Sequence, residues 1–552
     1  MILQRYSHFG KWTEVDYSPV FYIKQNLLRH GQEGGLWCLE DEASRLDVNN
    51  PVDIECRPYA TCHINDNKEA FSFSDFWFSK DAPMYLPWRK VGQYFEDYVD
   101  HFHLRTRIKL NTSVIKVKRE TNGAGWQVTT KPIIDTSPAP TTEMFDAVII
   151  CNGLMNRQYI PDVKGLATFK GRISHTGDYY RPDVFRDRNV LIIGGGNSAT
   201  EVASDISRET SQTYLSARDG LWPLSRLAGG KSAELLPIWS RYTNWRYKVS
   251  ELDKVYGGDV RKRFNFKDYS MEPKRGLLTM SIAIADDIEF RIAAGALKMK
   301  GEVKEITKTG AIFQDGSRID DIDDIVFATG FNPSTEFLDD SLGTLETINL
   351  YKYMIPVDDD SRSLFFIGIA NVLGPNTAAF ELQARIAARV LSGKLELPSK
   401  AVMLKISKED RRRLREIFGD EKFANDKYKK TEWYPPYIES LADILGVRPT
   451  PWRIFLLFFT DPKLAYELMF SFPLAVSYRL YGPDSNWALA RKGVIESKEN
   501  LMIPLRTVKY DEETNGVKNK VVAASIVVGM SAALLMYKFD KLPFISQFIK
   551  TY

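Results

Sequence analysis

The sequence predicts an α/β fold with two parallel-sheet domains of the Rossmann-like type, one inserted into the other, and a C-terminal helix. Three observations predict it. A glycine turn at 194–196 lies between an apolar strand and a helical stretch. Buried strands at 145–153 and 322–333, each ending in small residues, flank that turn and indicate two chain crossings between domains. An uncharged run of 17 residues, 521–537, follows a polar stretch near the C-terminus.

The segment NVLIIGGGNSATEVASDIS, residues 189–207, predicts a strand, a turn and a helix that together bind a dinucleotide. In the pattern Gly194-x-Gly196-x-x-Ala199, the first glycine makes the turn and the second lets a pyrophosphate approach the backbone. The small third residue lets the helix pack on the strand. Free N–H groups at the start of the helix favour phosphates. We therefore assign this site to Gly194, Gly196, Asn197, Ser198 and Ala199.

The strand after this helix decides which dinucleotide the site prefers. QTYLSAR, residues 212–218, ends in Ser216 and Arg218. An acid in this place would bind the ribose diol of NAD, whereas a hydroxyl and a guanidinium suit the 2′-phosphate of NADP. We expect NADP, with Ser216 and Arg218 as its ligands. Because Asp219 follows directly, NAD stays an alternative.

Composition excludes several other classes of protein. The 552 residues suffice for two or three domains, and the net charge of +3, without a basic run, predicts no nucleic-acid partner. The four cysteines form no CxxC or CxxxxC pair, which argues against a disulfide reductase and for free thiols. The six histidines show no ligand spacing, so we expect no metal site.

The C-terminal run predicts a transmembrane anchor over residues 517–540. Seventeen residues are at the short end of a spanning helix, and lysines flank the run on both sides. A buried core helix is the alternative. The N-terminus lacks a signal-peptide pattern, so we expect the bulk of the chain in the cytosol, anchored in a thin membrane such as the endoplasmic reticulum. The aromatic-rich segment 446–487 is either a subdomain core or a surface at the membrane interface.

Several motifs resemble the flavin-containing monooxygenase family. Just before the glycine turn, FKGRISHTGDY (169–179) is similar to the fingerprint of that family. Five further motifs, two before this fingerprint and three after it, occur in the same order as in the family. They are GGLW (34–37), NDNKEAFSFSDF (65–76), ATGF (328–331), LYKYMIP (350–356) and ELQAR (381–385). The related Baeyer–Villiger enzymes usually carry tryptophan where this chain has Tyr179. The resemblance therefore favours oxygenation of heteroatoms.

The resemblance implies an enzyme that uses NADPH, FAD and O₂ to oxygenate soft nitrogen or sulfur atoms of small lipophilic compounds through a flavin hydroperoxide. It places Asn65 beside the flavin as the catalytic residue, with Asp66 in the same cofactor-binding turn, and Leu36 and Trp37 packed near FAD. A neutral amide can donate to the peroxide without protonating it. The alternative is that Asn65 caps a turn.

The same resemblance implies the division of the chain. We expect a FAD-binding domain in two parts, 1–165 and 331–445, with an NADP-binding domain, 166–330, inserted between them. A hydrophobic subdomain, 446–510, and the anchor follow.

The expected FAD glycine motif is missing. Up to the end of GGLW the chain has only four glycines, Gly10, Gly31, Gly34 and Gly35, and none forms GxGxxG. We therefore expect the FAD pyrophosphate cradle to be absent and the central parallel strand of that sheet to be lost. The chain is then an enzyme with impaired flavin binding, an incomplete splice form, or a membrane-anchored NADP-binding protein without oxygenase activity.

Overall fold

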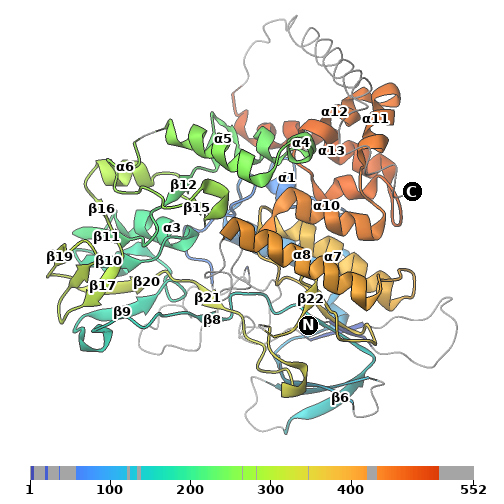
Figure 1. Cartoon of the computed structure of the whole chain (residues 1–552), viewed down its shortest axis with the longest axis horizontal. Helices are drawn as coiled ribbons and strands as arrows, with labels where there is room; N and C mark the ends of the chain where they lie inside the picture. Colours follow the sequence, from blue (N-terminus) through green and yellow to red (C-terminus); the bar gives the residue numbers. More distant parts are fainter. Residues whose placement is uncertain are drawn as a thin grey trace, which may run out of the picture.

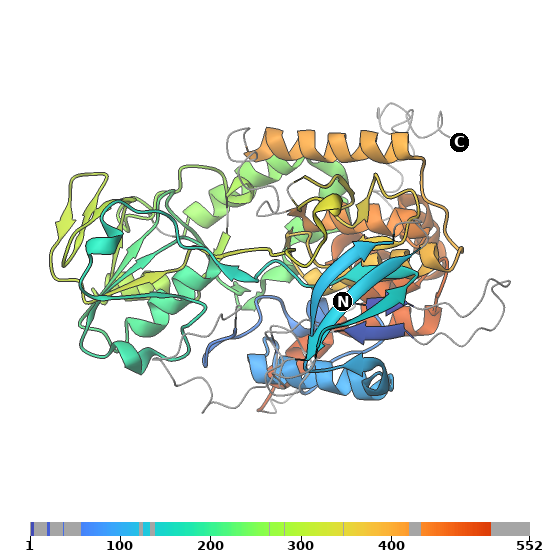
Figure 2. The same ribbon diagram turned by 90° about the horizontal axis from the view of Figure 1, so that it is seen from below.

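The computed structural model describes residues 57–508 apart from 121–124, 133–138, 264, 281, 346 and 419–431, together with 2–4, 19–22 and 37. It has a mixed α/β fold with two five-stranded sheets, which confirms the α/β class and the two-region organisation, although one of the two sheets predicted to be parallel is mixed (Figure 1). One sheet lies with α3 at one end of the molecule, and the other lies beside the C-terminal helices (Figures 1 and 2).

The sheet that contains the glycine turn, here called the cradle sheet, is parallel throughout. Its strands are ordered β16-β11-β10-β20-β9. Their bounds are β9 Arg172–His175, β10 Asn189–Ile193, β11 Gln212–Ser216, β16 Leu297–Lys300 and β20 Asp324–Phe327. The apolar side chains of β10 and β20 are buried because a parallel sheet is covered on both faces. Helix α3, Asn197–Ile206, follows β10 and buries Val202, Ala203 and Ile206.

The other sheet, here called the mixed sheet, has the order β24-β7-β1-β2-β3. Its strands are β1 Ile2–Gln4, β2 Pro19–Tyr22, β3 Ile108–Lys109, β7 Ala147–Ile150 and β24 Leu364–Phe366. β24 is parallel to β7, and β2 is parallel to β3, but β1 is antiparallel to both β7 and β2. β1, which lies between β7 and β2, therefore does not supply the central parallel strand that the family pattern contains and that we expect to be lost.

Smaller strands and helices connect the two sheets and cover them. A three-stranded antiparallel sheet consists of β4 Thr112–Arg119, β5 Trp126–Pro132 and β6 Thr141–Phe145. Short strand pairs are β8 Arg157–Gln158 with β21 Phe331–Asn332, β12 Trp222–Leu224 with β15 Ile282–Ile284, and β13 Leu227–Ala228 with β14 Lys231–Ser232. The helices between β11 and β16 are α4 Arg241–Arg246, α5 Val249–Arg261 and α6 Ile288–Ala293.

The C-terminal helices share one hydrophobic core with the region beside the mixed sheet. They are α7 Asn376–Leu391, α8 Lys400–Phe418, α10 Tyr434–Leu445, α11 Pro451–Thr460, α12 Pro462–Phe470 and α13 Trp487–Met502. On α11, Ile454 and Leu457 are buried in this core, whereas Trp452 and Phe459 are 65% and 70% exposed. The segment 446–487 therefore supplies a subdomain core and also carries an exposed aromatic face.

The predicted anchor at 517–540 lies outside the described residues. Within the part of the chain that the structure describes, every helix is too short or too polar to cross a bilayer.

Candidate cofactor site

The turn between β10 and α3 uses its two glycines in different ways. Gly194 has φ +155°, and a Cβ there would lie 2.2 Å from the carbonyl oxygen of Ala328 on the neighbouring strand end. Its N–H donates to the carbonyl of Ser216 at 3.0 Å. A Cβ on Gly196 would meet no atom within 4 Å. Gly194 is therefore needed for strand packing, whereas the face of Gly196 is open to a ligand.

The start of α3 suits the phosphates of a dinucleotide. Gly196 precedes the helix and, among the described residues, makes no side-chain cap bond, so the N–H groups of Asn197 and Ser198 stay available, whereas that of Ala199 donates to the Gly196 carbonyl at 3.0 Å. The Asn197 side chain accepts from the N–H of Ile284 at 2.8 Å and so holds β15 against the turn. Ala199 is fully buried and Ser198 is half-buried. This geometry fits the pyrophosphate of a bound dinucleotide.

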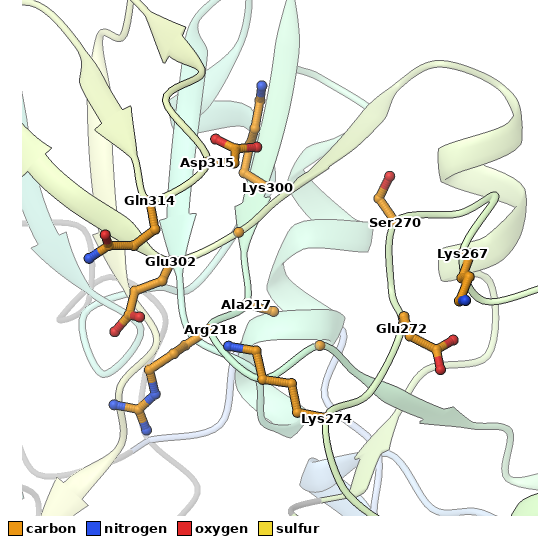
Figure 3. Close-up of a pocket in the computed structure, with 12 residues that line it drawn as sticks. Ala217, Arg218, Lys267, Ser270, Glu272, Lys274, Lys300, Glu302, Gln314 and Asp315 are labelled. Atoms are coloured by element: carbon orange, nitrogen blue, oxygen red, sulfur yellow. The ribbon is translucent and has the colours of Figure 1, made fainter.

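A pocket of about 390 Å³ lies beyond the end of β11 (Figure 3). Its lining holds four cationic side chains, Arg218, Lys267, Lys274 and Lys300, and three carboxylates, Glu272, Glu302 and Asp315. The Arg218 side chain is 61% exposed, with its Nε 3.5 Å from Asp219. Ser216, in contrast, is buried and its hydroxyl donates to the carbonyl of Gly301 at 2.7 Å. Arg218 is thus better placed than Ser216 to meet a 2′-phosphate, and both assignments stay predictions.

The two lysines from the 267–274 loop were not found by sequence reasoning. The loop is held beside β11 by backbone bonds from Lys274 N–H to the Asp219 carbonyl at 2.9 Å and from Leu221 N–H to the Met271 carbonyl at 3.0 Å. No local pattern in the sequence indicates these contacts, because they join residues about fifty positions apart.

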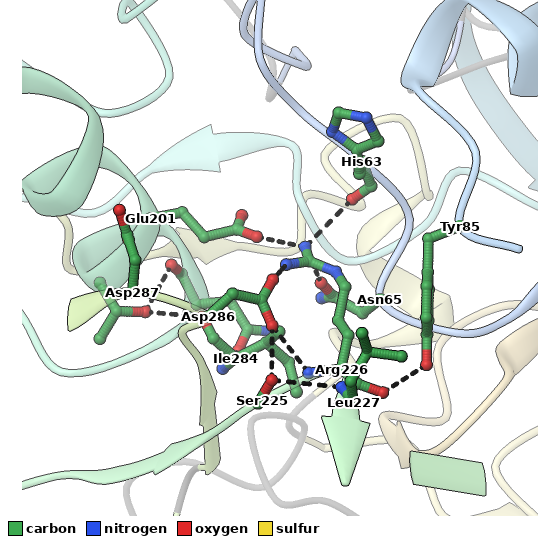
Figure 4. A network of polar contacts seen from close by, with 12 residues as sticks. His63, Asn65, Tyr85, Glu201, Ser225, Arg226, Leu227, Ile284, Asp286 and Asp287 are labelled. Carbon is green, nitrogen blue, oxygen red and sulfur yellow. Dashed lines mark hydrogen bonds and ion pairs between the residues drawn. The ribbon is translucent and has the colours of Figure 1, made fainter. Parts of the chain in front are cut away.

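Asn65 lies in a turn that contacts the segment after β12 (Figure 4). Its Oδ1 accepts from Nη2 of Arg226 at 2.8 Å. The same guanidinium bonds to Glu201 on α3 and to Asp286, the latter at 2.5 Å. Arg226 is 10% exposed. Burial lowers the pKa of its guanidinium, but the charges of Glu201 and Asp286 outweigh burial and raise the pKa above its ordinary value.

The neighbours of Asn65 have separate structural partners. Asn67 caps α1, Lys68–Phe71, by accepting from the N–H of Ala70 at 2.9 Å, so the capping role belongs to Asn67. The Asn67 side chain also donates to Ser232 at 2.8 Å and to Glu234 at 3.1 Å. Burial, with the nearby charge of Glu234, raises the pKa of Asp66 to about 8.

The segment before Asn65 packs against the cradle helix. The Tyr59 hydroxyl donates to Glu201, and Thr61 donates to Asp205 at 2.9 Å. Tyr179, from the fingerprint segment, donates to the same carboxylate of Asp205 at 2.6 Å. These contacts hold Asn65 next to the domain that carries the glycine turn.

Of the two residues predicted near FAD, Leu36 and Trp37, the structure describes Trp37. Trp37 packs edge-on against Phe71, with ring centroids 6.3 Å apart, beside the small core of Ile64, Leu86 and Val91. Leu36 lies outside the described residues. So do most of the residues before 57 in which the family pattern would hold the FAD diphosphate. The described residues thus supply the surroundings of Asn65 but do not identify a cradle for that diphosphate.

Two nested α/β regions, one with a dinucleotide cradle, are the architecture of enzymes that bind two dinucleotide cofactors. The profile described as flavin-binding monooxygenase-like matches residues 26–538. Flavin-containing monooxygenase 5 of Homo sapiens is 34% identical over 486 residues, which cover 86% of this chain and 87% of that protein. The enzyme of the same name from Rattus norvegicus is 33% identical over 515 residues, covering 91% and 93%. The chain therefore belongs to the flavin-binding monooxygenase-like family.

Solved structures agree on the fold. An S-allyl-L-cysteine S-oxygenase from Allium sativum aligns with a TM-score of 0.53 at 19% identity, over 84% of this chain and 91% of that one. A cyclohexanone monooxygenase from Rhodococcus sp. Phi1 bound to NADP⁺ aligns with a TM-score of 0.52 at 15% identity, over 72% and 91%. At these identities the likeness shows the fold alone.

Proposed function

We propose that this chain is an NADPH- and FAD-dependent monooxygenase that oxygenates soft nitrogen or sulfur atoms of small lipophilic amines or sulfides. One observation carries the proposal. Asn65, the residue that the resemblance places beside the flavin, is joined through Arg226 to Glu201 on the helix of the dinucleotide cradle. A hydride donor in that cradle and the Asn65 turn would thus belong to one connected site.

The residues of the chain would bind and orient the cofactors. The N–H groups at the start of α3 would hold the NADP pyrophosphate on the open face of Gly196, and Arg218 would meet the 2′-phosphate. Asn65 would donate from its amide nitrogen. FAD, when bound, would supply the oxygen chemistry, which the resemblance assigns to a flavin hydroperoxide. The proposed domain division is 1–165 with 331–445 for FAD and 166–330 for NADP.

A second candidate is an NADP-binding protein without oxygenase activity. The antiparallel direction of β1 in the mixed sheet and the missing GxGxxG in the sequence favour it. Without the cradle the FAD diphosphate loses N–H donors and a helix terminus, each worth on the order of 1 kcal/mol or more.

We also propose that residues 517–540 anchor the chain in the endoplasmic reticulum membrane with its bulk in the cytosol. The uncharged run at 521–537 and its flanking lysines support this. The exposed Trp452 and Phe459 on α11 are compatible with a surface that rests on the membrane interface.

The absorption spectrum of the purified full chain, in detergent, separates the two candidates. A flavin spectrum near one FAD per chain, with NADPH-dependent N- or S-oxide formation from a tertiary amine or a sulfide, supports the monooxygenase. A colourless protein that takes up no FAD on reconstitution but still binds NADP⁺ supports the second candidate.

Asn65→Asp tests the predicted catalytic residue. The substitution keeps the shape of the side chain and the oxygen that faces Arg226, but it removes the amide donor and adds a charge. We expect NADPH oxidation to continue while product per NADPH falls. An unchanged yield of product per NADPH would remove Asn65 from the catalytic site.

A further inference from the structure

The Arg226 guanidinium is surrounded by acceptors from three separate parts of the chain (Figure 4). Glu201 comes from the cradle helix, and Asp286 follows β15. The third group is the Asn65 turn, where Nη2 donates to Asn65 Oδ1 at 2.8 Å and Nε donates to the carbonyl of Ile64 at 3.1 Å. Each part is therefore held by the same buried cation.

The contact fixes which end of the Asn65 amide faces Arg226. A guanidinium has donors only, so an amide beside it must present its oxygen and turn its NH₂ group away. A flipped amide would put two donors against each other in a site where Arg226 is 10% exposed. Among the described residues, none accepts a hydrogen bond from Asn65 Nδ2, so this donor stays available to a ligand.

Arg226 is itself held rigidly. Its backbone N–H donates to Asp286 Oδ1 at 2.8 Å while Nη1 bonds to Asp286 Oδ2 at 2.5 Å. Ser225 donates to the same carboxylate at 3.0 Å. Glu201, on the other side, also accepts from Tyr59. A guanidinium held from both sides transmits a displacement of α3 to the Asn65 turn instead of absorbing it.

We propose that Arg226 is a positioning residue that orients the Asn65 amide with its N–H donors toward the bound cofactor and couples this turn to occupancy of the dinucleotide cradle. The inference deepens the proposed function and rests on it for the role of Asn65. It adds that NADP⁺ bound at α3 orders the Asn65 turn through Glu201 and Arg226. The connection runs through two side-chain contacts, Asn65–Arg226 and Arg226–Glu201, and needs no rearrangement of the sheet.

Hydrogen exchange of the full chain, with and without NADP⁺, tests the coupling. In the wild-type chain we expect NADP⁺ to slow exchange in α3 and also in residues 57–67. In Arg226→Met we expect the slowing in α3 to remain and that in 57–67 to be lost. Equal slowing of 57–67 in both proteins, or none in the wild type, would overturn the proposal. This measurement needs only NADP⁺ binding, so it stands apart from whether the chain makes product.

Two variants keep the test informative. Arg208→Met removes an exposed ion pair to Asp287, next in sequence to Asp286, and does not touch Asn65, so it should behave as wild type. Arg226→Lys keeps the charge at a site where methionine could prevent folding, but a lysine cannot donate to Ile64, Asn65 and both acids in a fixed plane. We expect Arg226→Lys to fold and to lose the slowing in 57–67.

In the holoenzyme, Arg226→Met should uncouple NADPH oxidation from oxygenation of the substrate. We expect Arg226→Met to raise hydrogen peroxide released per NADPH by on the order of tenfold, because a misplaced donor no longer serves the reaction. Asn65→Ala should have the same effect, and the double variant should add little to either one. Additive effects would show that Arg226 acts on something other than Asn65. Absence of product from the wild type would instead count against the proposed function.

Discussion

The cradle sheet and the mixed sheet occupy corresponding places in two nested regions, yet they are built differently. In the cradle sheet five parallel strands place the glycine turn and the start of α3 at one edge. In the mixed sheet β1 lies antiparallel beside β7. Only a parallel strand that leads through a glycine turn into a helix can present helix N–H groups to a phosphate at that edge. The difference is that the cradle sheet carries the glycine turn and the start of α3, whereas the described strands of the mixed sheet include an antiparallel strand beside β7.

The largest expected effect tests whether the cradle depends on its close strand packing. Gly194→Ala would place a Cβ 2.2 Å from the Ala328 carbonyl oxygen, so the variant should lose about 3 kcal/mol of stability and its NADP⁺ binding. Thermal unfolding and NADP⁺ titration measure this. Gly196→Ala is the matched control, because its Cβ meets open space. It should keep the midpoint of unfolding and lose only NADP⁺ affinity. Equal stability of the two variants would contradict the assigned roles.

The next effect concerns the opposite edge of the cradle sheet. Asp324 is fully buried at the start of β20 and bonds to Arg172 at 2.5 Å and to Arg188. Asp324→Ala should cost about 2–3 kcal/mol, less than a fully buried pair, since both arginines can regain water. The fall in the unfolding midpoint measures it.

Asp320→Ala serves as the comparison for Asp324→Ala. It removes an exposed ion pair with Arg318 and should cost less than about 0.5 kcal/mol. If both variants have the same unfolding midpoint, the buried carboxylate of Asp324 does not stabilise this sheet through its two arginines.

A smaller effect tests whether the dinucleotide cradle prefers NADPH or NADH. Arg218→Ala should lower the preference for NADPH over NADH by about 10–100-fold, the value of a charge-assisted hydrogen bond to phosphate. Comparing the dissociation constants of the two nucleotides measures it. Arg186→Ala removes an equally exposed arginine before β10, at the other edge of the sheet, and should leave the preference unchanged. An unchanged preference in Arg218→Ala would contradict the role of Arg218. It would mean that the lysines of the pocket bind the 2′-phosphate, or that the site binds NAD.

The last effect concerns pH at the turn between the two regions. Burial beside Glu234 raises the pKa of Asp66 to about 8 in the folded chain, above its ordinary value of 3.8. The folded state therefore binds the proton more tightly than the unfolded state, so this contribution to stability is full at acid pH and is lost as the pH rises toward about 8. Asp66→Asn should flatten the dependence of the unfolding midpoint between about pH 5 and pH 8. Asp315→Asn, an exposed carboxylate with a lowered pKa, should leave that dependence in place.

The cradle could be predicted because its signal is local. Glycines, an apolar strand and a small residue within eleven positions specify the strand, the turn and the helix by steric and hydrogen-bond rules alone. The family resemblance likewise rests on short motifs and is confirmed by the match over residues 26–538. Asn65 was named on its motif, and its role stays a prediction.

The partners of these residues could not be predicted from the sequence. Arg226 lies 161 positions from Asn65, and Lys274 lies in a loop beyond α5. Ser216 matches the phosphate pattern in sequence, yet its hydroxyl is turned into the sheet toward Gly301. Strand register and loop docking decide such contacts, and no local pattern encodes them.

The sequence by itself determined the fold class, the family, the dinucleotide turn and the absence of a GxGxxG before GGLW, because each depends on neighbouring residues. Only the tertiary structure decided that β1 runs antiparallel in the mixed sheet, that Arg218 lines a pocket together with three lysines and three carboxylates, and that Arg226 joins Asn65 to the cradle helix. These features depend on which distant segments are packed together. Packing follows from burying apolar surface while giving every buried charge a partner, and that balance is settled by the whole chain.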